Sequence, residues 1–296
     1  MTVAVLSEVR SFLTMSAAEE ATKEVDLDLA LQVAIEGAKG AGGLILKSFR
    51  KDVVNKKKSL TDPVTEVDLA CEDLLRALIA KHFPTHKFLG EESFEGSYNL
   101  SDDPTWVVDP IDGTANFVHG LQWTCVSVAL VVDKMPMVGV VFNPVTQEMY
   151  KAVRGKGAFM NDEKISPSQV EDMPSACICT EFGANRDPEV VQKKVDIMHK
   201  VIQSPVQALR CLGSCALNMC AVASGNVDGY YEWGMHPWDV AAAFLICTEA
   251  GAVVTDLDGS AFSITARRTL VANAKIQPQL KKIIMDAGAP MQPSVN

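Results

Sequence analysis

Two aspartates three residues apart are the most informative chemical feature of this sequence. Residues 106–116 read WVVDPIDGTAN, so an apolar stretch leads directly to Asp109 and Asp112. Carboxylates beside an apolar strand repel each other and resist leaving water unless a cation lies between them. Pro110 stiffens this segment, and Gly113 allows backbone amides to approach a bound oxyanion closely. The alternative interpretation is an ordinary pair of Asp-Pro and Asp-Gly turns.

Two further acidic segments favour a metal site. Glu91 and Glu92 follow a short predicted strand, and Asp239 falls in the first turn of an apolar helix that begins at Pro237. Taken singly, a solvated loop charge and an acid placed at a helix N-terminus explain them equally well. Taken together, they form a set of oxygen ligands without a nearby Cys or His, which selects Mg²⁺ or Mn²⁺ over zinc.

Composition limits the classes of function. The 296 residues are 48% hydrophobic and carry a formal net charge of −10, which predicts a folded globular protein with one large core or two closely packed halves. This charge disfavours nucleic acid and anionic membranes as partners. We find no apolar run of membrane-spanning length and no secretory signal pattern at the N-terminus. The eight cysteines then indicate reduced thiols and a cytoplasmic location.

Hydrophobic spacing predicts an α/β fold of layered helices and sheets. A long helix is expected from Asp26 to about residue 49, and a second helix begins at Thr65, where Asp68 completes a capping box. The pattern predicts an antiparallel sheet from strands at 87–89, 106–109, 125–132, 138–142 and 148–153. In the second half it predicts strands at 177–181, 228–232 and 252–256 and helices at 188–201, 214–224 and 237–250. We expect a loosely ordered arm over 1–25 and a catalytic domain over 26–296, with halves at about 26–165 and 166–296.

These motifs in combination resemble the inositol monophosphatase family. The match carries two signatures, Asp109-Pro-Ile-Asp-Gly-Thr-x-Asn116 and Trp238-Asp-Val-Ala-x-Ala243, with Gly90-Glu-Glu-Ser93 and Thr65-x-x-Asp68 in the expected order. It extends over nearly the whole chain from about Asp26. The resemblance implies an αβαβα sandwich, a homodimer, and a magnesium-dependent, lithium-sensitive phosphatase that hydrolyses myo-inositol monophosphate to myo-inositol and phosphate.

The resemblance also implies a role for individual residues. Two or three Mg²⁺ ions, which Mn²⁺ can replace, would be bound by Glu91, Asp109, the carbonyl of Ile111, Asp112 and Asp239. Catalysis would depend on Glu91 and on Asp68 paired with Thr114, which together orient and activate the attacking water. The substrate site would comprise Asp112, Gly113, Thr114, Gly213, Ser214, Cys215, Glu232 and Asp239. Because no Ser or Cys nucleophile with an adjacent base is evident, the expected reaction is direct attack by water.

Departures from the family pattern leave the substrate open. Residues 213–215 read Gly-Ser-Cys where inositol-specific relatives often have Gly-Thr-Ala, and His119-Gly120 follows the first signature. This version is similar to plant-type members that also accept L-galactose 1-phosphate. Histidinol phosphate and bisphosphorylated sugars or nucleotides are further alternatives within the enzyme class, and a catalytically silent binding protein is a remote one. Either Lys57 or Lys58 is expected to reach the site.

Three remaining motifs have structural interpretations. The glycines at 37, 40, 42 and 43 fall inside a helical pattern, which favours close helix packing over a dinucleotide-binding loop. The cysteines lack the spacing of a zinc site and are expected to be buried thiols. His236 is interpreted as a structural residue rather than an acid–base catalyst.

Overall fold

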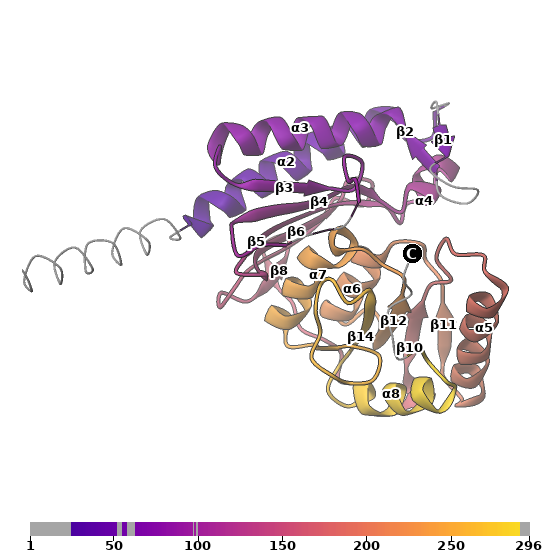
Figure 1. Cartoon of the computed structure of the whole chain (residues 1–296). Coiled ribbons are helices and arrows are strands. Elements are labelled where there is room, and N and C mark those ends of the chain that lie inside the picture. The colour runs from indigo at the N-terminus through magenta and orange to yellow at the C-terminus, as the bar shows by residue number, and fades with distance from the viewer. Residues whose placement is uncertain (1–24, 52–54, 58–62, 97, 99, 291–296) are drawn as a thin grey trace, which may run out of the picture.

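The computed structural model describes residues 25–51, 55–57, 63–96, 98 and 100–290, and they form five alternating layers (Figure 1). Helices α2 (Leu27–Ser48) and α3 (Glu66–His82) cover one face of a seven-stranded sheet. Helices α6 (Cys215–Ala223) and α7 (Pro237–Ala250) lie between this sheet and a five-stranded sheet. Helices α5 (Pro188–Gln203) and α8 (Ile276–Asp286) cover the outer face of the second sheet. The predicted αβαβα sandwich is therefore confirmed.

The first sheet has the order β3-β4-β5-β6-β7-β8-β9. Its strands are β3 (Lys87–Gly90), β4 (Thr105–Asp112), β5 (Cys125–Val132), β6 (Met135–Asn143), β7 (Glu148–Val153), β8 (Ala158–Met160) and β9 (Glu163–Lys164). The second sheet, in the order β11-β10-β12-β14-β13, comprises β10 (Cys177–Thr180), β11 (Ala208–Arg210), β12 (Gly229–Trp233), β13 (Val253–Thr255) and β14 (Arg268–Ala272). The hairpin β1 (Asn55–Lys57) and β2 (Pro63–Thr65), the short helix α4 (Thr114–His119) and the 3₁₀ turn η1 (Met173–Ser175) complete the described elements. The division into halves near residue 165 stays a prediction.

One strand pairing differs from the expected antiparallel sheet. Strand β3 runs parallel to β4, with Lys87 paired to Thr105 and Gly90 paired to Val108. Parallel neighbours need a long connection, which residues 91–104 supply. Because parallel strands end at the same edge of a sheet, the residue that follows β3, Glu91, is brought next to the end of β4.

Helix α2 begins at the expected cap and packs as a core helix. Asp26 accepts hydrogen bonds from the amides of the first turn. A Cβ on Gly37 would lie 2.7 Å from Leu75 Cδ2, and one on Gly42 would lie 2.7 Å from Phe142 Cε1. These glycines therefore let α2 approach α3 and the first sheet closely. The helix is long and apolar enough to cross a membrane by those measures alone, but the face that includes Gly37 and Gly42 is buried inside the protein.

Several elements match the sequence prediction closely, and others were missed. The bounds of β5, β7 and α7 are those expected, and Gly251 ends α7 with φ +96°. The short elements α4, β8, β9 and β11 were not predicted, nor were β14 and α8. For α8 a signal existed, because Ile276, Leu280 and Ile284 recur every four residues and are all buried.

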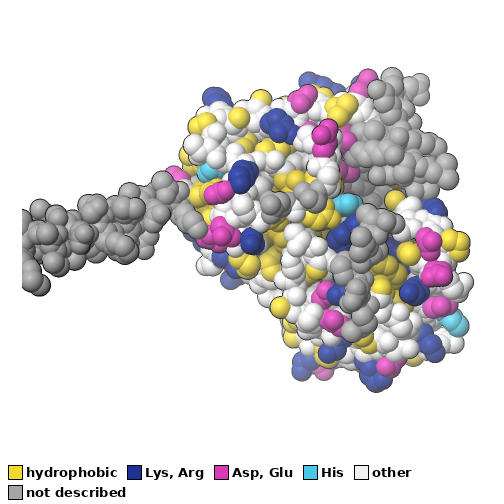
Figure 2. Space-filling view, in the orientation of Figure 1, with side chains coloured by type: hydrophobic (Ala, Val, Ile, Leu, Met, Phe, Trp, Pro, Cys, Tyr) yellow, Lys and Arg dark blue, Asp and Glu magenta, His cyan; other side chains and the backbone are white. Residues whose placement is uncertain are grey.

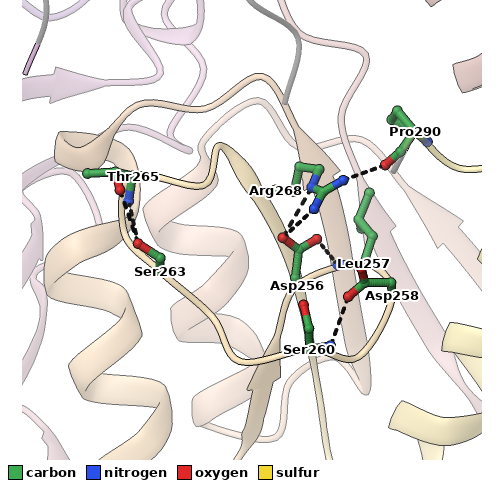
Figure 3. Close-up of polar contacts among 8 residues, drawn as sticks. All are labelled: Asp256, Leu257, Asp258, Ser260, Ser263, Thr265, Arg268 and Pro290. Carbon is green, nitrogen blue, oxygen red and sulfur yellow. Dashed lines mark hydrogen bonds and ion pairs between the residues drawn. The ribbon is translucent and has the colours of Figure 1, made fainter. Parts of the chain in front are cut away.

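A buried ion pair stabilises the second sheet at its far edge (Figure 3). Arg268 on β14 donates from Nη2 to Asp256 Oδ2 at 2.7 Å and from Nε to the same oxygen at 3.1 Å. Its Nη1 donates to the carbonyl of Pro290 at 2.8 Å, which attaches the segment after α8. The pair is almost completely withdrawn from solvent, so neither charge can lose its partner without a large penalty.

On the face shown in Figure 2, basic and acidic side chains are intermixed over both halves. The coloured residues on this face form no continuous basic surface. A mixed surface of this kind offers no broad attraction for a polyanion.

Asp256→Ala is expected to lower the free energy of unfolding by about 3–5 kcal/mol, because it leaves the Arg268 guanidinium buried without its counter-ion. The measurement is urea denaturation followed by circular dichroism. Asp258→Ala is the matched control: Asp258 accepts a hydrogen bond from the Ser260 amide at the surface, and its loss should amount to about 1 kcal/mol or less. Equal losses in the two variants would contradict the assigned role of the buried pair.

Candidate active site

A cleft of about 700 Å³ lies where the end of the first sheet, the start of α7 and the second sheet meet. Its walls include side chains from both halves of the chain. The predicted site residues among them are Glu91, Asp109, Ile111, Asp112, Gly113, Thr114, Gly213, Cys215, Glu232 and Asp239. Two predicted residues, Asp68 and Ser214, are not part of the wall, but each is hydrogen-bonded to a residue that is.

A bulge in β4 brings Asp109 and Asp112 to the same cleft. The strand was expected to end at Asp109, but it continues to Asp112 and is buried throughout, so neither aspartate belongs to a simple turn. Side chains three residues apart point to opposite faces of a regular strand. In the pairing of β4 with β5, however, the register shifts between these two aspartates. Asp109 pairs with Ser127 and Asp112 with Cys125, so β4 has one extra residue here. The extra residue turns Asp112 toward the side of Asp109, and Pro110 fits here because a bulge needs no ladder hydrogen bond from it.

Asp112 connects the two halves directly. Its Oδ2 accepts hydrogen bonds from Ser214 Oγ at 2.6 Å and from the amide of Ala216, at the start of α6, at 2.7 Å. Burial raises the pKa of Asp112 to about 6, although these hydrogen bonds act in the opposite direction. The carboxylate is therefore held by the second half of the chain while it faces the acidic side of the cleft.

The other carboxylates face the same space. Asp239 lies in the first turn of α7, where its Oδ2 accepts from the His236 amide at 2.7 Å. Ser127 of β5 fixes that turn by donating to the Trp238 carbonyl at 3.1 Å. Burial, and then the charges of neighbouring carboxylates that include Glu91, raises the pKa of both Asp109 and Asp239 well above the usual range. The acidic groups therefore repel one another across the cleft.

This donor set fits a hard divalent cation. Carboxylate oxygens and the Ile111 carbonyl are the ligands that Mg²⁺ and Mn²⁺ prefer, and a cation would relieve the repulsion among the carboxylates. Within the part of the chain that the structure describes, no group of three or more His, Cys, Asp or Glu side chains is already arranged as a metal site. Several of these oxygens instead accept protein hydrogen bonds, as Asp109 Oδ1 does from the Ile111 amide at 3.0 Å.

Asp68 and Thr114 form the expected pair. Thr65 caps α3, and its amide and hydroxyl both donate to Asp68 Oδ2, which confirms the capping box. The second oxygen, Oδ1, lies 3.3 Å from Thr114 Oγ1, which is also 2.9 Å from the Ile111 carbonyl. The capping and catalytic interpretations of Asp68 are therefore compatible, because each uses a different oxygen.

Sequence reasoning missed Glu181, which holds the turn at Gly213 in the wall of the cleft. Its Oε1 accepts hydrogen bonds from the amides of Leu212 and Gly213, both at 2.7 Å, and from Asn218 Nδ2 at 2.9 Å. Gly213 has φ +90°, and a Cβ there would lie 2.7 Å from Asn116 Nδ2, so glycine is required. A carboxylate directly after a parallel strand, here β10, is the signal that could have identified Glu181.

Glu232 lies in the cleft wall as expected, with Tyr230 as its neighbour. The Tyr230 hydroxyl donates to Glu232 Oε2. Burial raises the pKa of Glu232 to about 7, and the charge of Lys194 opposes that rise. Sequence reasoning also missed the basic residues Arg186, Lys194 and Arg267 in the wall.

The remaining motifs have structural roles in the described residues. The His236 ring stacks on Trp238 at 4.7 Å between centroids, and its Nε2 lies 3.3 Å from Arg267 Nη2, which supports the structural interpretation of His236. The eight cysteines are free thiols, and all but Cys177 and Cys211 are buried. The side chains of Lys57 and Lys58 lie outside the described residues, as does the expected arm before Val25.

Comparison with known proteins agrees with this geometry. Residues 26–288 match the model of the inositol monophosphatase family. The chain is 46% identical over 251 residues to inositol monophosphatase 2 of Solanum lycopersicum, covering 83% of this chain and 94% of the relative. It is 41% identical over 249 residues to inositol monophosphatase 1 of Homo sapiens, covering 83% and 90%. The inositol monophosphatase structure from Anabaena superposes with a TM-score of 0.78 at 32% identity, covering 90% and 98%.

The fold and the acidic cleft define a protein of the metal-dependent phosphatase class. The chain belongs to the inositol monophosphatase family. This membership confirms the resemblance seen in the sequence motifs.

Asp109→Asn is expected to stabilise the metal-free protein while weakening its response to metal. In EDTA at pH 7 the melting temperature should rise by about 2–6 °C, the response expected for 1–2 kcal/mol in a chain of this size. An unfolded aspartate ionises near 3.8, whereas the folded Asp109 keeps its proton to higher pH, so wild-type stability falls as pH rises and the advantage of Asn grows.

The measurement is a pair of melting curves with EDTA and with Mg²⁺, at several pH values. Asp162→Asn is the control, because its side chain is 98% exposed and should alter neither curve. A lower melting temperature of Asp109→Asn in EDTA, or an unchanged shift with Mg²⁺, would remove Asp109 from the proposed site.

Proposed function

We propose that this protein is an inositol-phosphate phosphatase that hydrolyses myo-inositol monophosphate to myo-inositol and phosphate. The observation that carries the proposal is the meeting, in one cleft, of four acidic side chains, the Asp68–Thr114 pair and the turn at Gly213. The names of the tomato and human relatives support the substrate class.

The proposed metal ligands are Glu91, Asp109, Asp112 and Asp239, together with the Ile111 carbonyl. A bound divalent cation would supply Lewis acidity, which lowers the pKa of an attacking water and neutralises charge on the phosphate. The chemistry of these ligands suits a hard divalent cation. All the donor atoms are oxygens, and most belong to carboxylates that repel one another without a cation.

Thr114 and Asp68 would orient the water and receive its proton. As the water oxygen bonds to phosphorus, its proton moves to Thr114 Oγ1, and the Thr114 proton moves to Asp68 Oδ1. Asp68 is suited to this role because Thr65 fixes its other oxygen. The bond from phosphorus to the ester oxygen breaks, and the departing alkoxide takes a proton from solvent. Glu91 would support this step from its place in the cleft wall.

The two ends of the substrate would contact different walls. Gly113 and Thr114 line the cleft, and their backbone amides would bind phosphate oxygens. Hydroxyls of the polyol would contact Glu232 and the turn of Gly213, Ser214 and Cys215. The carboxylates of Asp112 and Asp239 line the same cleft and would contact both phosphate and polyol.

Several finer properties belong to the same proposal. Mg²⁺ is the expected ion, with two or three bound and Mn²⁺ as a substitute, and lithium is the expected inhibitor. Eight free thiols favour a reducing compartment, and we propose the cytoplasm. By family resemblance the working unit would be a homodimer, with a small phosphate ester as its only required partner.

Phosphate release is expected to be fastest with myo-inositol monophosphate when purified protein and Mg²⁺ are given a panel of phosphate esters. The panel includes L-galactose 1-phosphate, histidinol phosphate and a bisphosphorylated nucleotide, because residues 213–215 differ from the commonest inositol-specific pattern. Lithium should inhibit the reaction, and EDTA should abolish it. A tenfold preference for another ester would reassign the substrate, and activity that persists in EDTA would refute the metal-dependent mechanism.

Asp239→Asn is expected to lower kcat by about 10³-fold or more at saturating Mg²⁺, because it removes a charged ligand at the reacting phosphate. The fold should persist, since an amide oxygen can still accept the hydrogen bond from His236. Circular dichroism and phosphate release are measured together, with Asp162→Asn as the exposed control. Near-normal turnover of Asp239→Asn would exclude this carboxylate from the mechanism.

A further inference from the structure

Lys194 is a buried lysine on the face of α5 that packs against the second sheet. It is 6% exposed and shares that face with Ile197 and Val201, which are fully buried. Lysine is rarely buried to this extent unless its charge is paired. Its Nζ donates to the Trp233 carbonyl at 3.2 Å and lies 4.7 Å from the centroid of the Trp233 ring. The ammonium is therefore directed to the end of β12, beside the cleft.

Gly183 lies close to both this ammonium and Glu232. A Cβ built on Gly183 would be 3.1 Å from Lys194 Nζ and 3.7 Å from Glu232 Oε1. The absence of a side chain at Gly183 leaves the two charged groups facing a common space. All three residues line the cleft. Because the Tyr230 hydroxyl is bonded to Oε2, the oxygen of Glu232 that faces this space is Oε1.

Charge balance gives Lys194 a second function besides packing. Burial lowers the pKa of Lys194, and the charge of Arg186 acts in the same direction, whereas the nearby charges of Glu232 and Glu181 oppose that fall and favour the protonated ammonium. Without that ammonium, two carboxylates would stand on the substrate side of an already acidic cleft. Burial raises the pKa of Glu232, and the loss of a nearby cation would raise it further.

We propose that Lys194 is a positioning residue for substrate specificity, which keeps Glu232 oriented and charged as an acceptor for hydroxyl groups of the polyol. The proposal rests on the proposed function, because it concerns the polyol end of that substrate. The Glu232 carboxylate is held at Oε2 by Tyr230 and attracted at Oε1 by Lys194, so it enters the cleft in one orientation. A hydroxyl that donates to Oε1 then binds without a rearrangement of the protein.

Lys194 is expected to affect the binding of substrate rather than the chemical step. The contacts of Lys194 are with Trp233, Glu181 and the Glu232 side of the cleft, away from the Asp68–Thr114 pair. A loss of uniform binding raises KM and leaves kcat nearly unchanged. A substrate without polyol hydroxyls should be much less sensitive, because it has nothing to donate to Glu232.

The test compares inositol monophosphate with phenyl phosphate, at saturating Mg²⁺, in steady-state phosphate release. Lys194→Met should raise KM for inositol monophosphate about tenfold, with kcat within threefold of wild type. The rise should exceed that for phenyl phosphate at least fivefold. Lys194→Arg retains the charge and should recover most of the affinity, and Lys193→Met, at the exposed neighbouring position, is the matched control.

A double-mutant cycle tests whether Lys194 acts through Glu232. Glu232→Gln alone should raise KM for inositol monophosphate, and adding Lys194→Met to it should change KM less than twofold further. Melting curves accompany each variant, and Lys194→Gln replaces the Met variant if that protein does not fold. Equal effects on both substrates, a loss of kcat without a change in KM, or full additivity in the cycle would overturn the proposal. If wild type hydrolyses phenyl phosphate but not inositol monophosphate, the proposed substrate fails and the role of Lys194 fails with it.

Discussion

Repulsion among acidic side chains in one cleft is the constraint on which the rest of this structure depends. Asp109, Asp112 and Asp239 are brought together at one cleft, where burial disfavours their ionised forms. The surrounding fold is arranged to hold them there. A bulge turns one aspartate toward the other, the first turn of α7 supplies the third, and Ser214 bonds to Asp112 from the opposite half.

The two halves are joined through polar contacts at the cleft itself. Asn116 Nδ2 donates to the Leu212 carbonyl at 2.7 Å, and a Cβ on Gly113 would lie 3.0 Å from the Gly213 carbonyl oxygen. Glu181 then holds the same turn from the second sheet. Because residues about 100 positions apart meet here, the cleft exists only when the segments around both are folded and in contact. A functional site at such a junction couples the stability of the first sheet to that of the second.

The sequence predicted the features that depend on local pattern and missed those that depend on distant contacts. Long apolar elements such as β5 and α7 were placed with their bounds, and the acidic residues were recognised from short motifs. The bulge was not predicted, since it appears only when β4 is paired with β5. The parallel pairing of β3 was missed for the same reason. Glu181 resembles any loop carboxylate until Gly213 is brought against it, whereas Lys194 could have been noticed as a charge on an otherwise apolar helix face.

The bulge in β4 makes the length of this segment as important as its composition. At its present length, a segment that paired regularly with β5, without the bulge, would place Asp112 on the face of the sheet opposite Asp109. The Asp112 carboxylate would then point into the apolar layer beneath α2 and α3, even though every acidic residue would still be present in the chain. Homologous chains in which the two aspartates are three residues apart should therefore keep the bulge, whichever residues occupy the intervening positions.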